Sequence, residues 1–231
     1  METMNQQKNR QCLLLFLKYP ERGKVKSRLA KDLNKDITLL LYKNFILDLL
    51  DTLKKGRFRV KICFHPPDSQ EKVTDWLGNN YVYMPQKGKD LGERMKNAFT
   101  TVYSEGFSKA VLIGSDIPDL NDAVLDEACE CDDHDAVIGP ASDGGYYLIG
   151  FKNNTFLPEI FEGIQWGRGT VFKKTIEILK KNNRRVHILP EWQDIDRLDD
   201  LRALFDRNRD TEFANSRTMV FLSANSGTLF K

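Results

Sequence analysis

Short apolar runs that end abruptly place the strongest constraint on how this chain folds. Residues 12–18 form a continuous apolar run of strand length that is broken by Tyr19 and Pro20. Residues 109–114 form a second such run, which stops at Ser115 and Asp116. Strands without polar alternation are typical of parallel sheets that are covered on both faces. The sequence therefore predicts a buried sheet with helices on both sides.

Helical periodicity lies between the apolar runs. Over residues 36–54, apolar side chains recur every three or four positions and form one stripe, and Gly56 offers a stop. Similar patterns predict helices over 71–77, 90–103, 121–129, 170–181 and 198–205, and strands over 58–64, 81–84, 136–138, 146–151 and 185–189. Asp90 and Asn121 are suited to cap two of these helices. This alternation predicts a three-layer α/β/α fold with an open, mostly parallel sheet.

The size and charge of the chain limit its organisation and its partners. Its 231 residues suffice for one substantial core. We expect residues 1–10 to be disordered, residues 11–207 to form a single catalytic domain, and the polar segment 208–231 to be a tail or a docked extension. Thirty-five Lys and Arg stand against 33 Asp and Glu, and this net charge of +2 indicates neither nucleic acid nor a membrane as partner.

The number and spacing of the cysteines indicate the cellular compartment of the protein. Four scattered cysteines favour free thiols, and no apolar run approaches the roughly 18 residues of a spanning helix, so we expect a cytoplasmic protein without a membrane span. Cys129, Cys131 and His134 lie close together in the sequence. They lack the paired Cys-x-x-Cys spacing of zinc sites, so the sequence argues against zinc binding there.

A basic segment follows the first predicted strand, where open α/β sheets bind their ligands. Residues 19–28 concentrate four cations around Gly23, namely Arg22, Lys24, Lys26 and Arg28. A glycine turn lets backbone N–H groups approach phosphate oxygens while the cations neutralise them. The segment matches neither the Walker nor the Rossmann pattern. The alternative interpretation is a solvated basic loop.

Carboxylates follow several later strands. Asp116 is a candidate ligand for Mg²⁺ or Mn²⁺, which bind one or two carboxylates together with phosphate oxygens. Asp119 is better suited to cap a helix. Asp194 and Asp196 follow the strand over residues 185–189, and they either add a metal contact or cap the helix that begins near residue 198.

Asp143 stands beside two glycines between apolar strands. Gly144 and Gly145 would allow the backbone to approach a ligand closely. Asp-Gly is also an ordinary hairpin turn, so the pattern alone does not assign a function to Asp143.

Several of these segments, in chain order, resemble the DUF2064 family of glycosyltransferase-A-like (GT-A) proteins, whose members are also described as transferases associated with radical-SAM and selenocysteine-containing domains. The resemblance is carried by residues 16–20, 23–29, 90–95, 114–120, 139–141 and 143–150 and by Trp166, within a stretch from Leu13 to about Leu201. The Asp-Gly-Gly-Tyr-Tyr segment is distinctive. The resemblance implies a GT-A fold and a transferase that uses a nucleotide-diphospho-sugar donor, with Mg²⁺ or Mn²⁺ as cofactor and a small-molecule acceptor.

The resemblance also implies roles for particular residues. Asp143 and Asp116 would be catalytic, and Asp116, Asp194 and Asp196 would bind the metal. The nucleotide and its phosphates would be bound by Lys18, Gly23, Lys24, Lys26, Arg28, Gly92, Arg94 and Ser115. The acceptor would be bound by Gly144, Gly145, Tyr146 and Trp166, although Trp166 could equally anchor a loop in the core. Ser115-Asp116 is not a full Asp-x-Asp motif, and Lys24 stands where relatives often carry Arg, which gives up forked hydrogen bonding.

Two other functions stay open. The basic loop and Asp194-Ile195-Asp196 also resemble nucleotidyltransferases of the same superfamily, including the guanylyltransferase that acts on phospholactate. Such an enzyme would condense an NTP with a phosphorylated small molecule and release pyrophosphate. A non-catalytic nucleotide-binding module is the third possibility, but it would be expected to have lost its carboxylates. The sequence leaves the base, sugar, acceptor, stereochemical outcome and oligomeric state undetermined.

Overall fold

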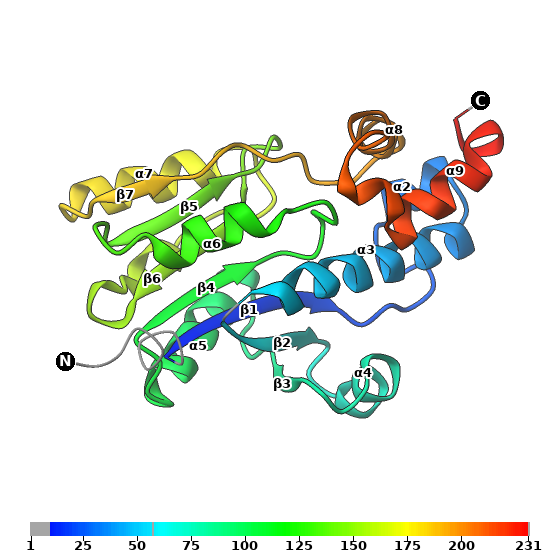
Figure 1. Cartoon of the computed structure of the whole chain (residues 1–231). Helices are drawn as coiled ribbons and strands as arrows, with labels where there is room; N and C mark the ends of the chain where they lie inside the picture. Colours follow the sequence, from blue (N-terminus) through cyan, green and yellow to red (C-terminus); the bar gives the residue numbers. More distant parts are fainter. Residues whose placement is uncertain (1–9, 57, 231) are drawn as a thin grey trace.

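One seven-stranded sheet forms the centre of the molecule (Figure 1). The computed structural model describes residues 10–56 and 58–230. The strand order is β3-β2-β1-β4-β6-β5-β7. The strands are β1 (Gln11–Lys18), β2 (Arg59–His65), β3 (Val82–Pro85), β4 (Lys109–Ile113), β5 (Ala136–Pro140), β6 (Tyr146–Lys152) and β7 (Val186–Ile188). Each of them overlaps a strand that the sequence predicts.

The sheet is mostly parallel, which confirms the predicted fold class. β1 pairs in parallel with β2 and β4, β2 pairs with β3, and β5 pairs with β7. β6 runs antiparallel to its neighbours β4 and β5. The reversal follows from the short connection between β5 and β6, because antiparallel strands can be joined by a tight turn whereas parallel strands need a long crossover.

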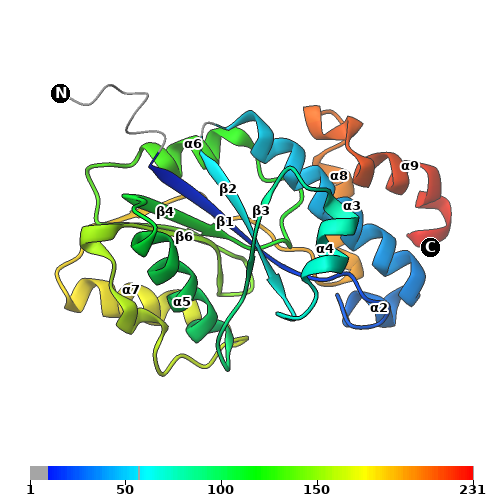
Figure 2. The same ribbon diagram turned by 90° about the horizontal axis from the view of Figure 1, so that it is seen from below.

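Helices cover both faces of the sheet, as Figure 2 shows with the sheet between them. Leu13 and Leu15 of β1 point into a core with α3 and α6, whereas Leu14 and Phe16 point into a second core with α5 and α7. The helices are α2 (Leu29–Asp32), α3 (Lys35–Lys55), α4 (Gln70–Leu77), α5 (Leu91–Ser104), α6 (Asp122–Glu130), α7 (Val171–Lys181), α8 (Leu198–Arg207) and α9 (Arg217–Leu229), with single turns η1 (Asn153–Thr155), η2 (Pro158–Phe161) and η3 (Glu212–Asn215). Along the described residues, no helix combines the length and the apolar character that crossing a membrane requires.

Side-chain caps fix where several helices begin. The Asp90 carboxylate accepts a hydrogen bond from the backbone N–H of Glu93 at 2.9 Å, and Asn121 accepts one from Val124 at 3.0 Å. Both residues are the caps that the sequence predicts. Each such cap stabilises its helix by about 1 kcal/mol.

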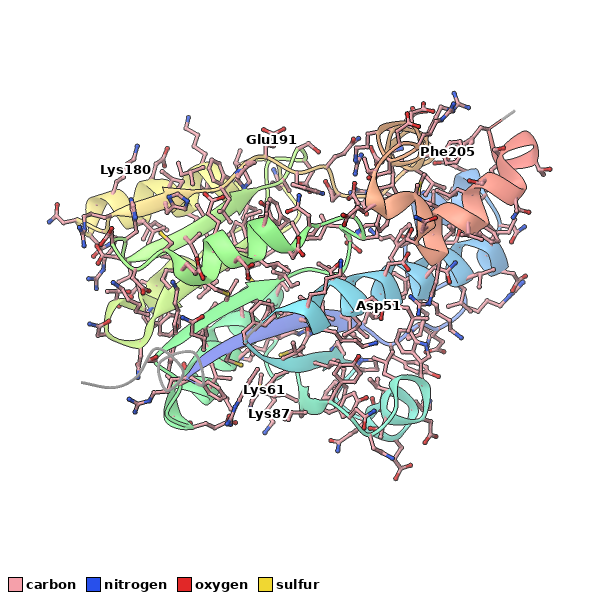
Figure 3. The ribbon with its side chains drawn as sticks, in the orientation of Figure 1. Asp51, Lys61, Lys87, Lys180, Glu191 and Phe205 are labelled. Carbon is pink, nitrogen blue, oxygen red and sulfur yellow. The ribbon has the colours of Figure 1, made fainter. Side chains whose placement is uncertain are left out.

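The segment 208–231 contains a helix that the sequence analysis did not predict. Met219 and Leu222 of α9 are buried with Leu41 and Phe45 of α3 in a third apolar cluster. The Asp48 carboxylate accepts hydrogen bonds from the first backbone N–H groups of this helix. Phe205, labelled on α8 in Figure 3, lies with its ring 5.6 Å from that of Phe230. Contacts distant in sequence therefore stabilise α9, whose own sequence includes the weak helix formers Ser223, Asn225, Ser226 and Gly227.

The expected disorder of residues 1–10 falls almost entirely outside the described residues. Only Arg10 of that stretch is described.

Truncating the α9–α3 contact should destabilise the protein. Leu222 is fully buried, so Leu222→Ala should lower the free energy of unfolding by about 2–5 kcal/mol through lost burial and a residual cavity. Val220 lies on the same helix with 60% of its surface exposed, and Val220→Ala should change that free energy by no more than about 0.5 kcal/mol. Urea unfolding followed by circular dichroism measures both. Equal effects of the two variants would show that α9 is not docked in this way.

Candidate functional site

A cavity of about 750 Å³ lies at the carboxyl ends of the parallel strands. Its lining includes Lys18 at the end of β1, His65 at the end of β2, Gln86 after β3 and Asp116 after β4. Further lining comes from the turn between β5 and β6 and from the segment that follows β7. This volume lies within the range of pockets that bind small molecules and cofactors.

Lys26 forms the central contact of this cavity. Its Nζ lies 2.7 Å from Asp116 Oδ1 and 3.0 Å from Asp196 Oδ1, and its side chain is only 3% exposed. Burial would lower the pKa of Lys26, but the two carboxylates outweigh burial and raise it. Lys26 also adopts a φ of 47°, an unfavourable backbone region for a residue with a side chain. The fold therefore holds a charged ammonium between two carboxylates at some cost to the backbone.

Arg28 reaches the same carboxylate from outside. Its Nη1 lies 3.0 Å from Asp196 Oδ2, and more than half of its side chain is exposed. Burial alone would raise the pKa of Asp196, but Lys26 and Arg28 outweigh it and lower that pKa. Asp196 is thus ionised and bound by two cations from the loop after β1.

The rest of the basic segment is divided between the cavity and the surface. Lys18 Nζ donates to the backbone carbonyl of Lys24 at 2.7 Å and so joins the end of β1 to the loop. Gly23 adopts a φ of 75° in the turn and does not line the cavity. Arg22 is directed away, towards Asp36, and forms an ion pair with it at 2.6 Å. Lys18, Lys24, Lys26 and Arg28 therefore line the cavity, whereas Arg22 does not.

Tyr42 of α3 joins the first and fourth strands beneath the cavity. Its hydroxyl accepts from the backbone N–H of Lys18 at 2.9 Å, donates to the Lys18 carbonyl at 3.0 Å and lies 3.4 Å from Ser115 Oγ. Ser115 is buried at this point. Sequence reasoning placed Tyr42 only on an apolar helix stripe, because a helix pattern does not reveal a hydroxyl contact with a strand end.

Asp143 shapes the turn between β5 and β6. Its Oδ1 accepts a hydrogen bond from the Gly145 N–H at 2.7 Å, and both residues line the cavity. Gly144 has a φ of 84°, and an added Cβ would come within 2.3 Å of the Gly169 carbonyl oxygen. Gly144 is therefore required by the turn rather than exposed to a ligand. The hairpin interpretation and the cavity position both apply to Asp143.

Asp194 faces two other carboxylates. Its pKa is raised to about 6 by burial and by the negative charges of Asp143 and Asp196. Neither Asp194 nor Asp196 caps α8, because the Asp200 carboxylate accepts from the backbone N–H of Arg197 at 2.8 Å and performs that role.

The three candidate metal ligands do not form a ready cage. Across residues 10–56 and 58–230, the carboxylate oxygens of Asp116, Asp194 and Asp196 do not all come within 4.8 Å of one another. Asp116 and Asp196 instead share Lys26 as a common partner.

Trp166 lies where it could contact an acceptor and also where it anchors a loop, which are the two interpretations that the sequence left open. It lines the cavity, and it also packs edge-on against Tyr146, 6.3 Å away, and in a stacked arrangement against Phe161. Gly92 lies directly against the indole, where an added Cβ would be 2.6 Å from Trp166 Nε1. Gly92 therefore makes room for the tryptophan and is not among the residues that line the cavity. Arg94 lines it, with Nε donating to the Gly88 carbonyl at 3.2 Å.

His65, Gln86 and Arg168 are polar lining residues to which the sequence analysis gives no role. Gln86 Nε2 donates to the carbonyls of Leu17 and Cys63, and the rule that ligands lie after strand ends could have found Gln86 and His65. Arg168 lies in a loop between a 3₁₀ turn and α7, where no strand end precedes it.

Asp119 is not the helix cap that the sequence predicts, since Asn121 caps α6. Its carboxylate is 3% exposed and accepts from Trp192 Nε1 at 3.0 Å, from Arg207 Nε at 2.8 Å and from Asn208 Nδ2 at 2.8 Å. These bonds connect the loop after β4 to the segment that carries Asp194 and to the end of α8. Asp119 therefore supports the site from behind.

The fold belongs to the nucleotide-diphospho-sugar transferase class. A crystal structure from Desulfovibrio desulfuricans G20, provisionally described as a nucleotide-diphospho-sugar transferase, is 40% identical and superposes with a TM-score of 0.93, over 96% of this chain and 97% of that one. The family described as "Uncharacterized protein conserved in bacteria (DUF2064)" matches residues 48–168, which is more than half of the chain. The chain belongs to the DUF2064 family.

More distant relatives include nucleotidyltransferases. A 2-phospho-L-lactate guanylyltransferase from Methanocaldococcus sp. (strain FS406-22) is 24% identical over 169 residues, which cover 71% of this chain and 70% of that protein. A cytidylyltransferase structure from Leptospira borgpetersenii is 15% identical with a TM-score of 0.53, over 95% of this chain and 96% of that one. The second likeness concerns the fold alone.

Removing the Asp119 carboxylate should destabilise the protein strongly. Asp119→Ala leaves the Arg207 guanidinium and two other donors without their shared acceptor, so the free energy of unfolding should fall by about 3–5 kcal/mol. Asp126→Ala, at an exposed position on α6, should change it by no more than about 0.5 kcal/mol. Chemical denaturation of both variants decides the matter, and a mild effect at Asp119 would contradict a supporting role.

Proposed function

We propose that this protein is a glycosyltransferase that uses a nucleotide-diphospho-sugar donor. The observation that carries the proposal is the meeting of Lys26 with Asp116 and Asp196 inside a cavity at the carboxyl edge of the sheet. The cavity thus contains both cations, which can bind phosphates, and carboxylates, which can bind a metal. The family membership and the 40% identical structure support the same class of reaction.

The donor diphosphate would be bound by the loop after β1. Lys26 and Arg28 can turn from the Asp196 carboxylate towards phosphate oxygens, and charge-assisted hydrogen bonds would hold the phosphates there. Lys18 and Lys24 line the same wall. The hydrogen bond from Lys18 to the Lys24 carbonyl would hold the loop in this shape while the donor binds.

Asp116 and Asp196 could together bind a divalent cation in place of the Lys26 ammonium. Asp116 Oδ1 and Asp196 Oδ1 both lie within 3.0 Å of one ammonium group, so both can reach one cation. Mg²⁺ prefers one or two carboxylates, phosphate oxygens and water, and this arrangement meets that preference. Among the described residues, Asp194 does not form a three-carboxylate cluster with them. When bound, Mg²⁺ or Mn²⁺ would neutralise charge on the phosphate oxygens.

The acceptor would be a small molecule with a hydroxyl group. In the described part of the chain, neither Asp143 nor Asp194 forms an ion pair or accepts a hydrogen bond from another side chain, although Asp143 Oδ1 accepts one from the backbone N–H of Gly145. A hydroxyl must lose its proton to become a nucleophile, and Asp143 is the proposed base. Tyr146 and Trp166 would flank the acceptor.

Nucleotidyl transfer is the second candidate. The guanylyltransferase relative favours it, and Arg94 and Arg168 line the cavity where a phosphorylated acceptor would be bound. Such an acceptor brings an oxygen that is already anionic and needs no base, so Asp143 would have no role in proton transfer. A non-catalytic nucleotide-binding module ranks third, because Asp116, Asp143, Asp194 and Asp196 all line the cavity.

The proposal includes the cellular setting. We expect cytoplasmic substrates and no nucleic-acid partner, because all four cysteines are free and the net charge is +2.

Product analysis separates the candidate reactions. The purified protein, with Mg²⁺ or Mn²⁺, is incubated with a panel of nucleotide sugars and, separately, with NTPs plus phosphorylated acceptors, and the products are identified by mass spectrometry. A nucleoside diphosphate together with a glycosylated acceptor is the expected result. Pyrophosphate released from an NTP only in the presence of an acceptor would establish nucleotidyl transfer instead.

Replacing the proposed base should impair turnover without impairing donor binding. Asp143→Asn should lower kcat by about 10²–10⁴-fold, which is the usual contribution of a general base. The dissociation constant of the nucleotide, measured by calorimetry, should stay unchanged. Asp126→Asn on the exposed face of α6 is the matched control. A loss of nucleotide affinity equal to the loss of turnover would argue against the role of a base.

Replacing the proposed metal ligand should have a different signature. Asp116→Asn should weaken Mn²⁺ binding and lower the metal-dependent rate by about 10²–10³-fold, since a bound metal supplies several kcal/mol of charge stabilisation. Electron paramagnetic resonance of Mn²⁺ measures the binding. An unchanged metal affinity and an unchanged rate would together refute the metal assignment.

A further inference from the structure

A second cluster of metal-binding side chains lies away from the cavity. Cys131 and His134 lie in the connection between α6 and β5, and His187 lies on β7. His187 pairs with Val137 near the amino end of β5, whereas the cavity lies at the carboxyl ends of the parallel strands. Figure 1 shows β5 and β7 towards the edge of the sheet opposite to β3 and α4. None of the three side chains lines the cavity.

The three side chains converge on one point. Cys131 Sγ lies 3.3 Å from His134 Nδ1, and the rings of His134 and His187 have centroids 5.2 Å apart. One ligand atom from each residue lies within 4.8 Å of the other two, and all three residues are half-buried. A tetrahedral zinc ion with ordinary Zn–S and Zn–N lengths would hold a sulfur and a nitrogen about 3.6 Å apart. The Cys131–His134 pair is already near that spacing.

Neighbouring groups fix the cluster in position. The Glu127 Oε1 atom lies 2.7 Å from His187 Nε2, so the carboxylate either orients this ring for a metal at Nδ1 or is itself a fourth ligand. Lys109 Nζ donates to the backbone carbonyl of Cys131 at 3.1 Å and holds the loop that carries the thiol.

We propose that Cys131, His134 and His187 bind a zinc ion. Thiolate and imidazole ligands select zinc over Mg²⁺ or Ca²⁺, which prefer oxygen. The sequence argument against zinc considered Cys129, which is buried in the apolar core and is not part of this group. The third ligand comes instead from His187, which is far along the chain and is brought near by the pairing of β7 with β5. The missing Cys-x-x-Cys pair is thus replaced by a histidine on an edge strand.

The bound ion would connect an edge strand to the body of the fold. β7 pairs with one neighbour only, over three residues. From β7 the chain runs directly to Asp194 and Asp196 in the cavity. A metal that joins β7 to the α6–β5 connection would therefore fix the start of the segment that supplies these carboxylates.

Cobalt titration of the full chain tests the proposal. The protein is stripped of metal with a chelator and titrated with Co²⁺, and the thiolate-to-cobalt charge-transfer band is recorded. The band should saturate at one equivalent of Co²⁺ and disappear on addition of Zn²⁺. It should be lost in Cys131→Ser and in His187→Gln, each checked for native circular dichroism. Glu127→Gln should weaken Zn²⁺ affinity by about 10- to 100-fold.

Two controls separate this site from the cavity and from other histidines. Asp116→Asn should keep the cobalt band, because carboxylates give no thiolate transition, so failure of the proposed transferase function would leave this result unaffected. His65→Gln should also keep it. The absence of a band from the wild-type protein, or its persistence in both His134→Gln and His187→Gln, would overturn the proposal.

Discussion

The buried contact between Lys26 and the carboxylates of Asp116 and Asp196 is the interaction on which the arrangement of the site depends. It joins the loop after β1, the end of β4 and the segment after β7, which are far apart in the sequence. A backbone hydrogen bond from Ile195 to the Asp116 carbonyl reinforces the same junction. A deeply buried ammonium must be paired with a negative charge. The three segments therefore cannot separate without exposing the Lys26 ammonium to solvent or leaving it buried without a partner. The positive φ of Lys26 is the local cost of this arrangement.

Much of the fold followed from periodicity. Apolar runs without alternation identified the strands of a sheet covered on both faces, and stripes identified the helices between them. Periodicity could not predict the antiparallel direction of β6 or the docking of α9 on α3. The antiparallel course of β6 depends on a turn that includes Gly144, and α9 depends on burial against α3 and on the Asp48 carboxylate. Neither effect is visible within the segment concerned.

The candidate site was predictable to the extent that strand ends meet at one edge of a sheet. That rule predicts that the segments after β1, β4 and β7 meet, and Lys26, Asp116 and Asp196 of these segments do line one cavity. It did not find Tyr42, which reaches the cavity floor from a helix, and it misassigned Asp119, whose partners lie some 73 to 89 positions later. Short-range patterns carry no information about such partners. The sequence therefore identified the side chains that line the cavity better than the ones that support them.

The Lys26 contact has a thermodynamic consequence for the proposed reaction. A cation that arrives alone at Asp116 and Asp196 would displace the ammonium and leave it buried without a partner. A diphosphate that binds without a metal would draw Lys26 away from Asp116 and Asp196. The two carboxylates would then repel the negatively charged diphosphate. When both arrive together, the ammonium exchanges carboxylates for phosphate and the carboxylates exchange the ammonium for the metal. Donor and metal should therefore bind with positive cooperativity, each raising the affinity for the other by the same factor.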